Sequence, residues 1–103
     1  HILMPGSDVD DILNRLLPAL PAGVLVHIHD IFLPLDYPPA WAWRGYNEQS
    51  AVAQLVLAGG YEIVFASHYV AENMGDKLAE TVLAQLPFPA GAFETSLWLR
   101  KSA

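Results

Sequence analysis

The chain has 103 residues, of which 53% are hydrophobic and only 16% are charged, against a usual charged fraction of about 25%. This composition excludes a disordered chain, and the length leaves room for a single domain or part of one. Eleven acidic residues against five Lys and Arg give a net charge of −6 with no basic run, which argues against a nucleic-acid partner, and the lack of cysteine excludes disulfides and thiolate sites.

The first half of the chain predicts a helix, a strand and a long loop. Ser7 and the acids after it are typical of a helix start, and apolar residues three and four apart extend this helix over about 8–17, after which Pro18 and Pro21 stop it. The apolar run at 23–29 has little polar alternation, which is typical of a strand covered on both faces and usually parallel. Residues 30–46 carry several prolines and aromatic side chains, so we expect a loop without regular structure, of the kind that forms lids and binding sites.

The second half predicts two further helices and two further strands. Asn47 is a good N-cap for the first of these helices, and Gly59 is a good stop signal for it. The expected elements are a helix at 48–57, a strand at 61–67, a weaker helix at 71–86 and a last strand at 94–100. In this last strand Thr95, Leu97 and Leu99 alternate with Ser96, Trp98 and Arg100. The fold class expected from this order is α/β, in a single unit that covers residues 1–103.

Polar residues stand at the end of the first predicted strand, at His27, His29 and Asp30. Ligands of open α/β sheets bind outside the carboxyl ends of strands, so His29 and Asp30 occupy a position typical of groups that do chemistry. His27 and His29 are two residues apart and are expected on one face of the strand. Three interpretations stay open: a catalytic or substrate-contacting role, a divalent metal site, or structural hydrogen bonding.

The loop after this strand is rich in aromatic side chains, and Arg44 is its one cation. Either the rings cap the open end of a core, or they form a pocket wall in which Arg44 contacts an anion or a carboxylate. The residues proposed for such a substrate-binding wall are Phe32, Tyr37, Trp41, Arg44 and Tyr46, together with His27 of the strand.

Other polar residues have simpler interpretations. Glu48 is expected to be a partner of the helix dipole, since it stands in the first turn of a predicted helix. His68 and Tyr69 follow the second predicted strand and are expected to be surface loop residues. Arg100 and Lys101 are expected to be solvated.

Several common motifs are missing from the sequence. Gly59 and Gly60 precede a strand rather than follow one, so neither a dinucleotide-binding turn nor a P-loop is present. No apolar run approaches the roughly 20 residues of a membrane span and no signal peptide is seen, so we expect a soluble, cytoplasmic protein without a membrane partner. Met4 is preceded by three residues, and we expect a chain that starts within a longer protein; a short leader before Met4 is the alternative.

Four segments, in order, carry a resemblance to a known family. They are Pro5 to Val9, Gly23 to Pro34 with its stretch His-Asp-Ile-Phe-Leu-Pro, Asp36 to Pro38, and Asn47 to Gln49. In this combination the chain resembles the C-terminal half of a class I S-adenosylmethionine-dependent methyltransferase, of the branch with a His-Asp-Ile-Phe-x-Pro segment after its fifth strand. The resemblance covers nearly the whole chain.

The resemblance implies a partial Rossmann-like sheet with flanking helices. The three predicted strands would be the fifth, sixth and seventh of the family order 3-2-1-4-5-7-6, with the seventh antiparallel. His29 and Asp30 would be the catalytic residues, with His29 as the base that takes a proton from a small-molecule methyl acceptor, and His1 would approach them. S-adenosylmethionine is the cofactor of the family, but its Gly-rich loop is not among these residues, so we expect no cofactor on this chain alone.

Two alternative functions remain open besides methyl transfer. The chain is alternatively a stand-alone binding or assembly module that forms a homodimer through the exposed edge of the strand at 23–29, because an uncovered apolar edge is a template for strand pairing. A third, weaker hypothesis is a small metal-dependent enzyme centred on His27, His29 and Asp30.

Overall fold

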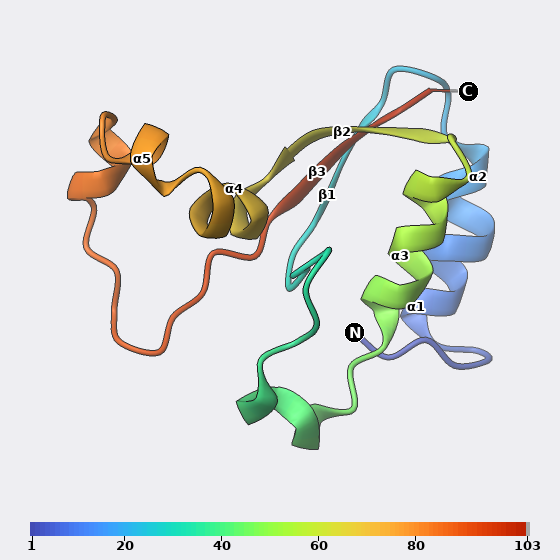
Figure 1. Ribbon diagram of the computed structural model, residues 1–103. Coiled ribbons are helices and arrows are strands. Elements are labelled where there is room, and N and C mark those ends of the chain that lie inside the picture. Colours follow the sequence, from blue (N-terminus) through green and yellow to red (C-terminus); the bar gives the residue numbers. More distant parts are fainter. Residues whose placement is uncertain (103) are drawn as a thin grey trace.

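The computed structural model describes residues 1–102 as a mixed α/β fold around a small three-stranded sheet (Figure 1). The strands are β1 (Leu25–Ile28), β2 (Tyr61–Ala66) and β3 (Leu97–Lys101). Their order in the sheet is β1-β3-β2, and β3 runs antiparallel to both neighbours. The three strands predicted from the sequence are confirmed, although the last begins later than expected.

The strands β1 and β3 differ in how far they are buried. Leu25 of β1 is 52% exposed, and within the described residues β1 pairs on one side only, with an antiparallel neighbour. The prediction of a strand covered on both faces with parallel neighbours is therefore wrong. In β3 the expected alternation is confirmed: Leu97 and Leu99 are buried while Trp98 and Arg100 are exposed, as the two-residue period of a strand requires.

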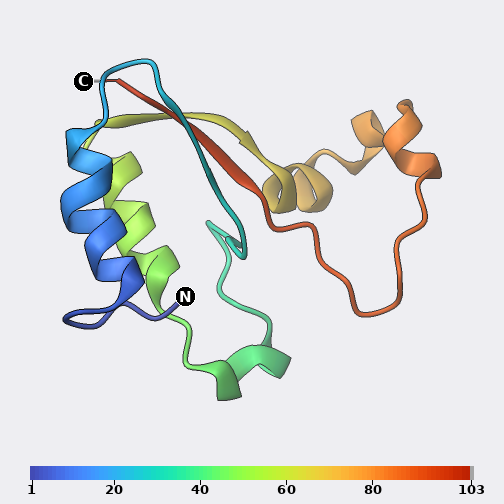
Figure 2. The same cartoon turned by 180° about the vertical axis from the view of Figure 1, so that it is seen from behind.

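Two helical segments run side by side on one side of the sheet (Figures 1 and 2). The first segment consists of α1 (Asp8–Asp11), a π-helical turn (Ile12–Leu16) and α2 (Leu17–Ala19), and the second is α3 (Glu48–Leu57), as predicted. Ser7 caps the first segment, because its Oγ accepts a hydrogen bond from the backbone N–H of Asp10 at 3.1 Å. The core between the helices and the sheet consists of Leu13, Leu17, Ile31, Val52, Tyr61, Leu97 and Leu99.

Pro18 does not end the first helical segment, contrary to the prediction. The backbone N–H of Leu17 donates to the carbonyl of Ile12, five residues earlier, which makes the π-helical turn directly before Pro18. In a regular helix a proline ring collides with the carbonyl four residues before it, and a wider turn gives that carbonyl room. The segment therefore continues to Ala19.

Lys101 closes the carboxyl end of this segment. Its Nζ donates to the carbonyl of Leu17 at 2.9 Å and to that of Pro18 at 2.7 Å, and the phenol of Tyr61 also donates to Leu17. A cation at a helix carboxyl end satisfies unpaired carbonyls and favours the helix dipole. Lys101 was expected to be solvated, and it is instead buried.

The region after β2 differs most from the expectation. α4 (Ser67–Asn73) begins directly where β2 ends, and α5 (Gly75–Leu78) and a 3₁₀ helix (Val82–Gln85) follow it, so the single helix predicted over 71–86 is wrong. The first break falls at Met74, which has a non-helical backbone conformation between α4 and α5. α4 and α5 lie at the end of the sheet away from the helix pair (Figure 1). No helix of residues 1–102 has the length and apolar character needed to cross a bilayer.

The long loop after β1 is anchored to α3 by Gln49. The side-chain oxygen of Gln49 accepts from the backbone N–H of Phe32 at 2.8 Å, and its Nε2 donates to the carbonyl of Leu35 at 3.1 Å. Its backbone N–H donates to the phenol oxygen of Tyr37 at 3.1 Å. Part of the loop forms a 3₁₀ helix, Pro39–Arg44, where no regular element was expected. The loop is therefore a fixed part of the fold.

Candidate functional site

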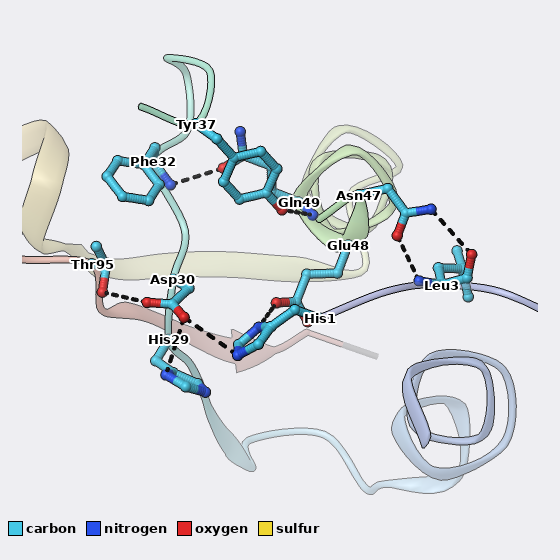
Figure 3. Close-up of polar contacts among 10 residues, drawn as sticks. All are labelled: His1, Leu3, His29, Asp30, Phe32, Tyr37, Asn47, Glu48, Gln49 and Thr95. Carbon is cyan, nitrogen blue, oxygen red and sulfur yellow. Dashed lines mark hydrogen bonds and ion pairs between the residues drawn. The ribbon is translucent and has the colours of Figure 1, made fainter. Parts of the chain in front are cut away.

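Two histidines and two carboxylates meet beyond the carboxyl end of β1 (Figure 3). The ring of His1 lies between the two acids: its Nε2 is 3.3 Å from Oδ2 of Asp30, and its Nδ1 hydrogen-bonds to Oε1 of Glu48. Nδ1 of His29 lies 3.8 Å from the same Asp30 oxygen, and the rings of His1 and His29 pack edge-on with centroids 4.6 Å apart. We call His1, His29, Asp30 and Glu48 the His-acid cluster.

Asp30 has a backbone conformation that is uncommon for a residue with a side chain. Its φ is 60°, in the left-handed region, which aspartate tolerates better than most residues. The turn places its carboxylate beside His1, and Oγ1 of Thr95 donates to the other carboxylate oxygen at 3.3 Å (Figure 3). The backbone N–H of Ile31 also donates to the carbonyl of Thr95 at 3.0 Å, so Thr95 holds the turn through both its side chain and its backbone.

The N-terminal segment is held against the start of α3. The backbone N–H of Asn47 donates to the carbonyl of His1 at 3.2 Å, and the side chain of Asn47 exchanges two hydrogen bonds with the backbone of Leu3. Asn47 stands at the N-cap position of α3, as predicted, but its side chain makes no cap hydrogen bond and binds Leu3 instead. These contacts place His1 beside Glu48, the first residue of α3.

Glu48 is the buried acid of the cluster, with only 11% of its side chain exposed. Burial raises the pKa of Glu48 above its ordinary value of 4.5, Asp30 raises it further, and the His1 amino group and His29 oppose this in part. An imidazole between two carboxylates hydrogen-bonds to both only if it carries two protons or if one carboxylate is protonated. Because its pKa is raised, Glu48 is the carboxylate suited to be the protonated one. The cluster can therefore hold a proton and release it.

A cavity of ≈ 300 Å³ opens beside the cluster, between the first helical segment, β1 and α3. This volume is at the low end of small-molecule sites, which run from about 300 to 1,000 Å³. Its polar lining comes from His1, Asp8, His27, His29 and Glu48, and its apolar lining includes Val9 and Val52. The sequence placed His27 and the loop at 30–46 in the wall of a site, whereas this wall combines His27 and its neighbours in β1 with helices whose apolar stripes were assigned to the core.

Tyr46 connects the cluster to the aromatic loop. Its ring stacks on that of His1 with centroids 4.4 Å apart, and it meets the rings of Tyr37 and Trp41 at 5.9 Å each. The guanidinium of Arg44 lies 4.0 Å from the centroid of the Trp41 ring, and its buried Nε has no hydrogen-bond partner among the described residues. The structure thus brings four of the predicted wall residues together, with Arg44 as the cation among them.

Of the two remaining predicted residues, Phe32 packs against the aromatic rings of the loop and His27 lines the cavity. Phe32 is 1% exposed and packs edge-on against Tyr37 and Trp41, so it supports these rings from beneath. His27 hydrogen-bonds through Nε2 to Oγ of Ser96 at 3.0 Å and packs against Trp98, with ring centroids 4.6 Å apart. The group expected from the sequence, His27 with His29 and Asp30, is not formed, because His1 takes the position beside Asp30.

The described residues do not fit S-adenosylmethionine, the cofactor implied by the resemblance. That cofactor needs a Gly-rich turn after a strand, where backbone N–H groups approach it closely. Here β1 is followed by His29 and Asp30, β2 passes directly into α4 at Ser67, and the pair Gly59-Gly60 precedes β2. No step that uses this cofactor is therefore assigned to these residues.

The chain was compared with known proteins in three ways. A scan against protein-family models, a search of curated proteins and a search of solved structures each find no match to this chain.

Proposed function

We propose that this chain is the acceptor-side part of an S-adenosylmethionine-dependent methyltransferase, in which the His-acid cluster contacts a small protic molecule and takes up its proton. The observation that carries the proposal is the cluster itself, with two imidazoles and two carboxylates beside a small cavity. It stands at the carboxyl end of β1, the edge at which α/β sheets bind their ligands. A cytoplasmic location is part of the proposal.

The strand order supports the methyltransferase part of the proposal. The resemblance implies that the last three strands lie in the order 5-7-6 with the seventh antiparallel to its neighbours. The observed order is β1-β3-β2, with β3 antiparallel to both. This arrangement makes β1 and β2 parallel to each other although they are not adjacent, so their carboxyl ends share one edge of the sheet.

The residues have separate roles in the proposal. His29 is the base, because its side chain is 65% exposed and an imidazole accepts protons near neutral pH. Asp30 orients His29, and the pair of His1 and Glu48 receives the proton from the site. Arg44 contacts an acidic group of the acceptor. Positioning and proton transfer are the contributions that an acceptor half can make to methyl transfer.

A ligand pair tests the acceptor site. Phenol offers an aromatic ring and one acidic proton, and anisole has the same ring without the O–H. We expect phenol to bind about tenfold more tightly than anisole, which is the worth of one hydrogen bond of about 1.4 kcal/mol. The measurement is an NMR titration that follows the four histidine side chains.

Matched variants locate the effect. His29→Ala is expected to remove the preference for phenol, whereas Arg100→Ala, a change at an exposed residue of β3 outside the cavity lining, keeps it. Equal binding of phenol and anisole by the unaltered chain contradicts the proposed base. Calorimetric titration with S-adenosylmethionine and S-adenosylhomocysteine is expected to give no heat; micromolar binding would contradict the assignment of the cofactor site to other residues.

The free edge of β1 favours a second candidate function, a self-pairing assembly module. β1 is an edge strand of the described sheet, and Leu25 stands exposed on it. An apolar strand with an open edge can pair with the same strand of a second copy. Sedimentation velocity over a hundredfold range of concentration tests it: a concentration-dependent dimer supports the module, and a monomer throughout removes it.

A further inference from the structure

A second polar cluster lies at the carboxyl end of β2, apart from the His-acid cluster. It consists of His68 and Glu72, both in α4, and Glu94, which precedes β3. Nδ1 of His68 is 2.8 Å from Oε1 of Glu94, and the three residues offer ligand atoms that all lie within 4.8 Å of one another. His68 and Glu72 are four residues apart in α4 and therefore project from the same face of the helix.

His68 and Glu94 are held in place by their surroundings. The backbone N–H of Ser67 donates to the carbonyl of Ser96 at 2.9 Å, and the backbone N–H of Ser96 donates to Oγ of Ser67 at 2.7 Å. This pair of bonds ties the start of α4 to the segment that carries Glu94. The ring of His68 also packs edge-on against the buried Phe32 at 4.9 Å, and His68 is only 8% exposed.

The charges of this cluster call for a cation. The carboxylates of Glu72 and Glu94 stand close together. Among the described residues Glu94 forms an ion pair with His68. Packing against Phe32 fixes the imidazole of His68, and a ligand whose side chain is already fixed needs little reorganisation to bind a metal ion. Glutamate oxygens and imidazole nitrogens are together the donor set for Zn²⁺, Mn²⁺ and Fe²⁺.

We propose that His68, Glu72 and Glu94 form a binding site for a divalent transition-metal ion. Neighbouring ligand atoms of a tetrahedral zinc ion lie about 3.3 Å apart, given metal–ligand bonds of about 2.05 Å. The contact of His68 with Glu94 already has this scale, and the exposed side chain of Glu72 closes the remaining gap by a rotamer change. Three protein ligands leave a coordination position open to solvent. The site does not depend on the function proposed for the His-acid cluster.

Zinc binding with matched variants tests this site. We expect the unaltered chain to bind one Zn²⁺ per chain in a calorimetric titration, and Glu72→Gln to weaken that binding by about tenfold or more. Because Glu72 is exposed, this variant keeps the fold. Glu80→Gln, a change at an exposed glutamate of the following segment, is the control and is expected to leave the binding unchanged.

A second group with metal-ligand geometry, His1, His29 and Asp30, lies in the His-acid cluster. The experiment must distinguish zinc binding at that group from zinc binding at His68, Glu72 and Glu94. NMR of the histidine side chains is expected to show that Zn²⁺ shifts the resonances of His68 and that Asp30→Asn leaves this shift in place. Zinc binding that Asp30→Asn abolishes and Glu72→Gln does not, or no binding by the unaltered chain, overturns the proposal.

Discussion

Replacement of Lys101 by methionine removes the cation that closes the first helical segment and keeps most of the apolar stem. The change deletes two hydrogen bonds from an ammonium group, each worth about 1.5 to 3 kcal/mol. Part of this is recovered because the buried ammonium no longer has to be desolvated, and because Leu17 keeps its bond from Tyr61 while the exposed Pro18 can bind water. We expect a net loss of about 2 kcal/mol in the free energy of unfolding.

Urea denaturation followed by tryptophan fluorescence measures this loss, since Trp98 lies in β3 beside the site of the change. A loss of 2 kcal/mol lowers the urea midpoint by about 1.3 M at a slope of about 1.5 kcal/mol per M. Arg100→Met is the matched control: Arg100 is exposed and pairs with Glu62 at 3.5 Å, and such surface pairs contribute about 0 to 1 kcal/mol. If Lys101→Met is no less stable than Arg100→Met, the buried cap contributes nothing and the reasoning is refuted.

Three further predictions concern the core, the loop anchor and the buried acid. Leu99 is 0% exposed, so Leu99→Ala is expected to cost about 3 to 5 kcal/mol in thermal or urea unfolding, while Leu57→Ala at an exposed leucine of α3 changes little. Gln49→Ala leaves the backbone N–H of Phe32 unpaired and is expected to cost about 2 kcal/mol, with faster amide exchange at Phe32 as its specific sign. Because the folded state raises the pKa of Glu48, it keeps a proton that the unfolded state releases, and stability falls as pH rises from 4.5 through the raised pKa. Glu48→Gln is expected to lack this fall, so its stability relative to the unaltered chain increases as pH rises from 4.5 through the raised pKa of Glu48, as measured by urea titrations.

The elements that the sequence predicted well are those set by local chemistry. Ser7 caps the first helical segment through its own hydroxyl, and the alternation in β3 follows from the two-residue period of a strand. The π-helical turn before Pro18 was not predictable in the same way, because a proline usually ends a helix. The continuation depends on Lys101, whose position is known only from the fold.

The candidate site was predicted in part for the same reason. His29 and Asp30 are adjacent in sequence and stand at a strand end, so the pattern identified them. His1 and Glu48 are 47 residues apart, and their contact depends on Asn47 holding the N-terminal segment. From the sequence, the helix dipole was enough to explain an acid at position 48. Nothing local therefore indicated that Glu48 belongs to the cluster.

The central place of β3 sets the order in which this fold can form during synthesis. β1 and β2 have no contact in the ladder except through β3, which is the last of the described strands. While the ribosome is still making the residues before Leu97, both strands expose unpaired backbone, and the helix pair has no complete sheet to pack on. Neither β1 nor β2 can therefore take its place in the sheet before β3 has been synthesised, and the pairing of both strands is a late, non-local event.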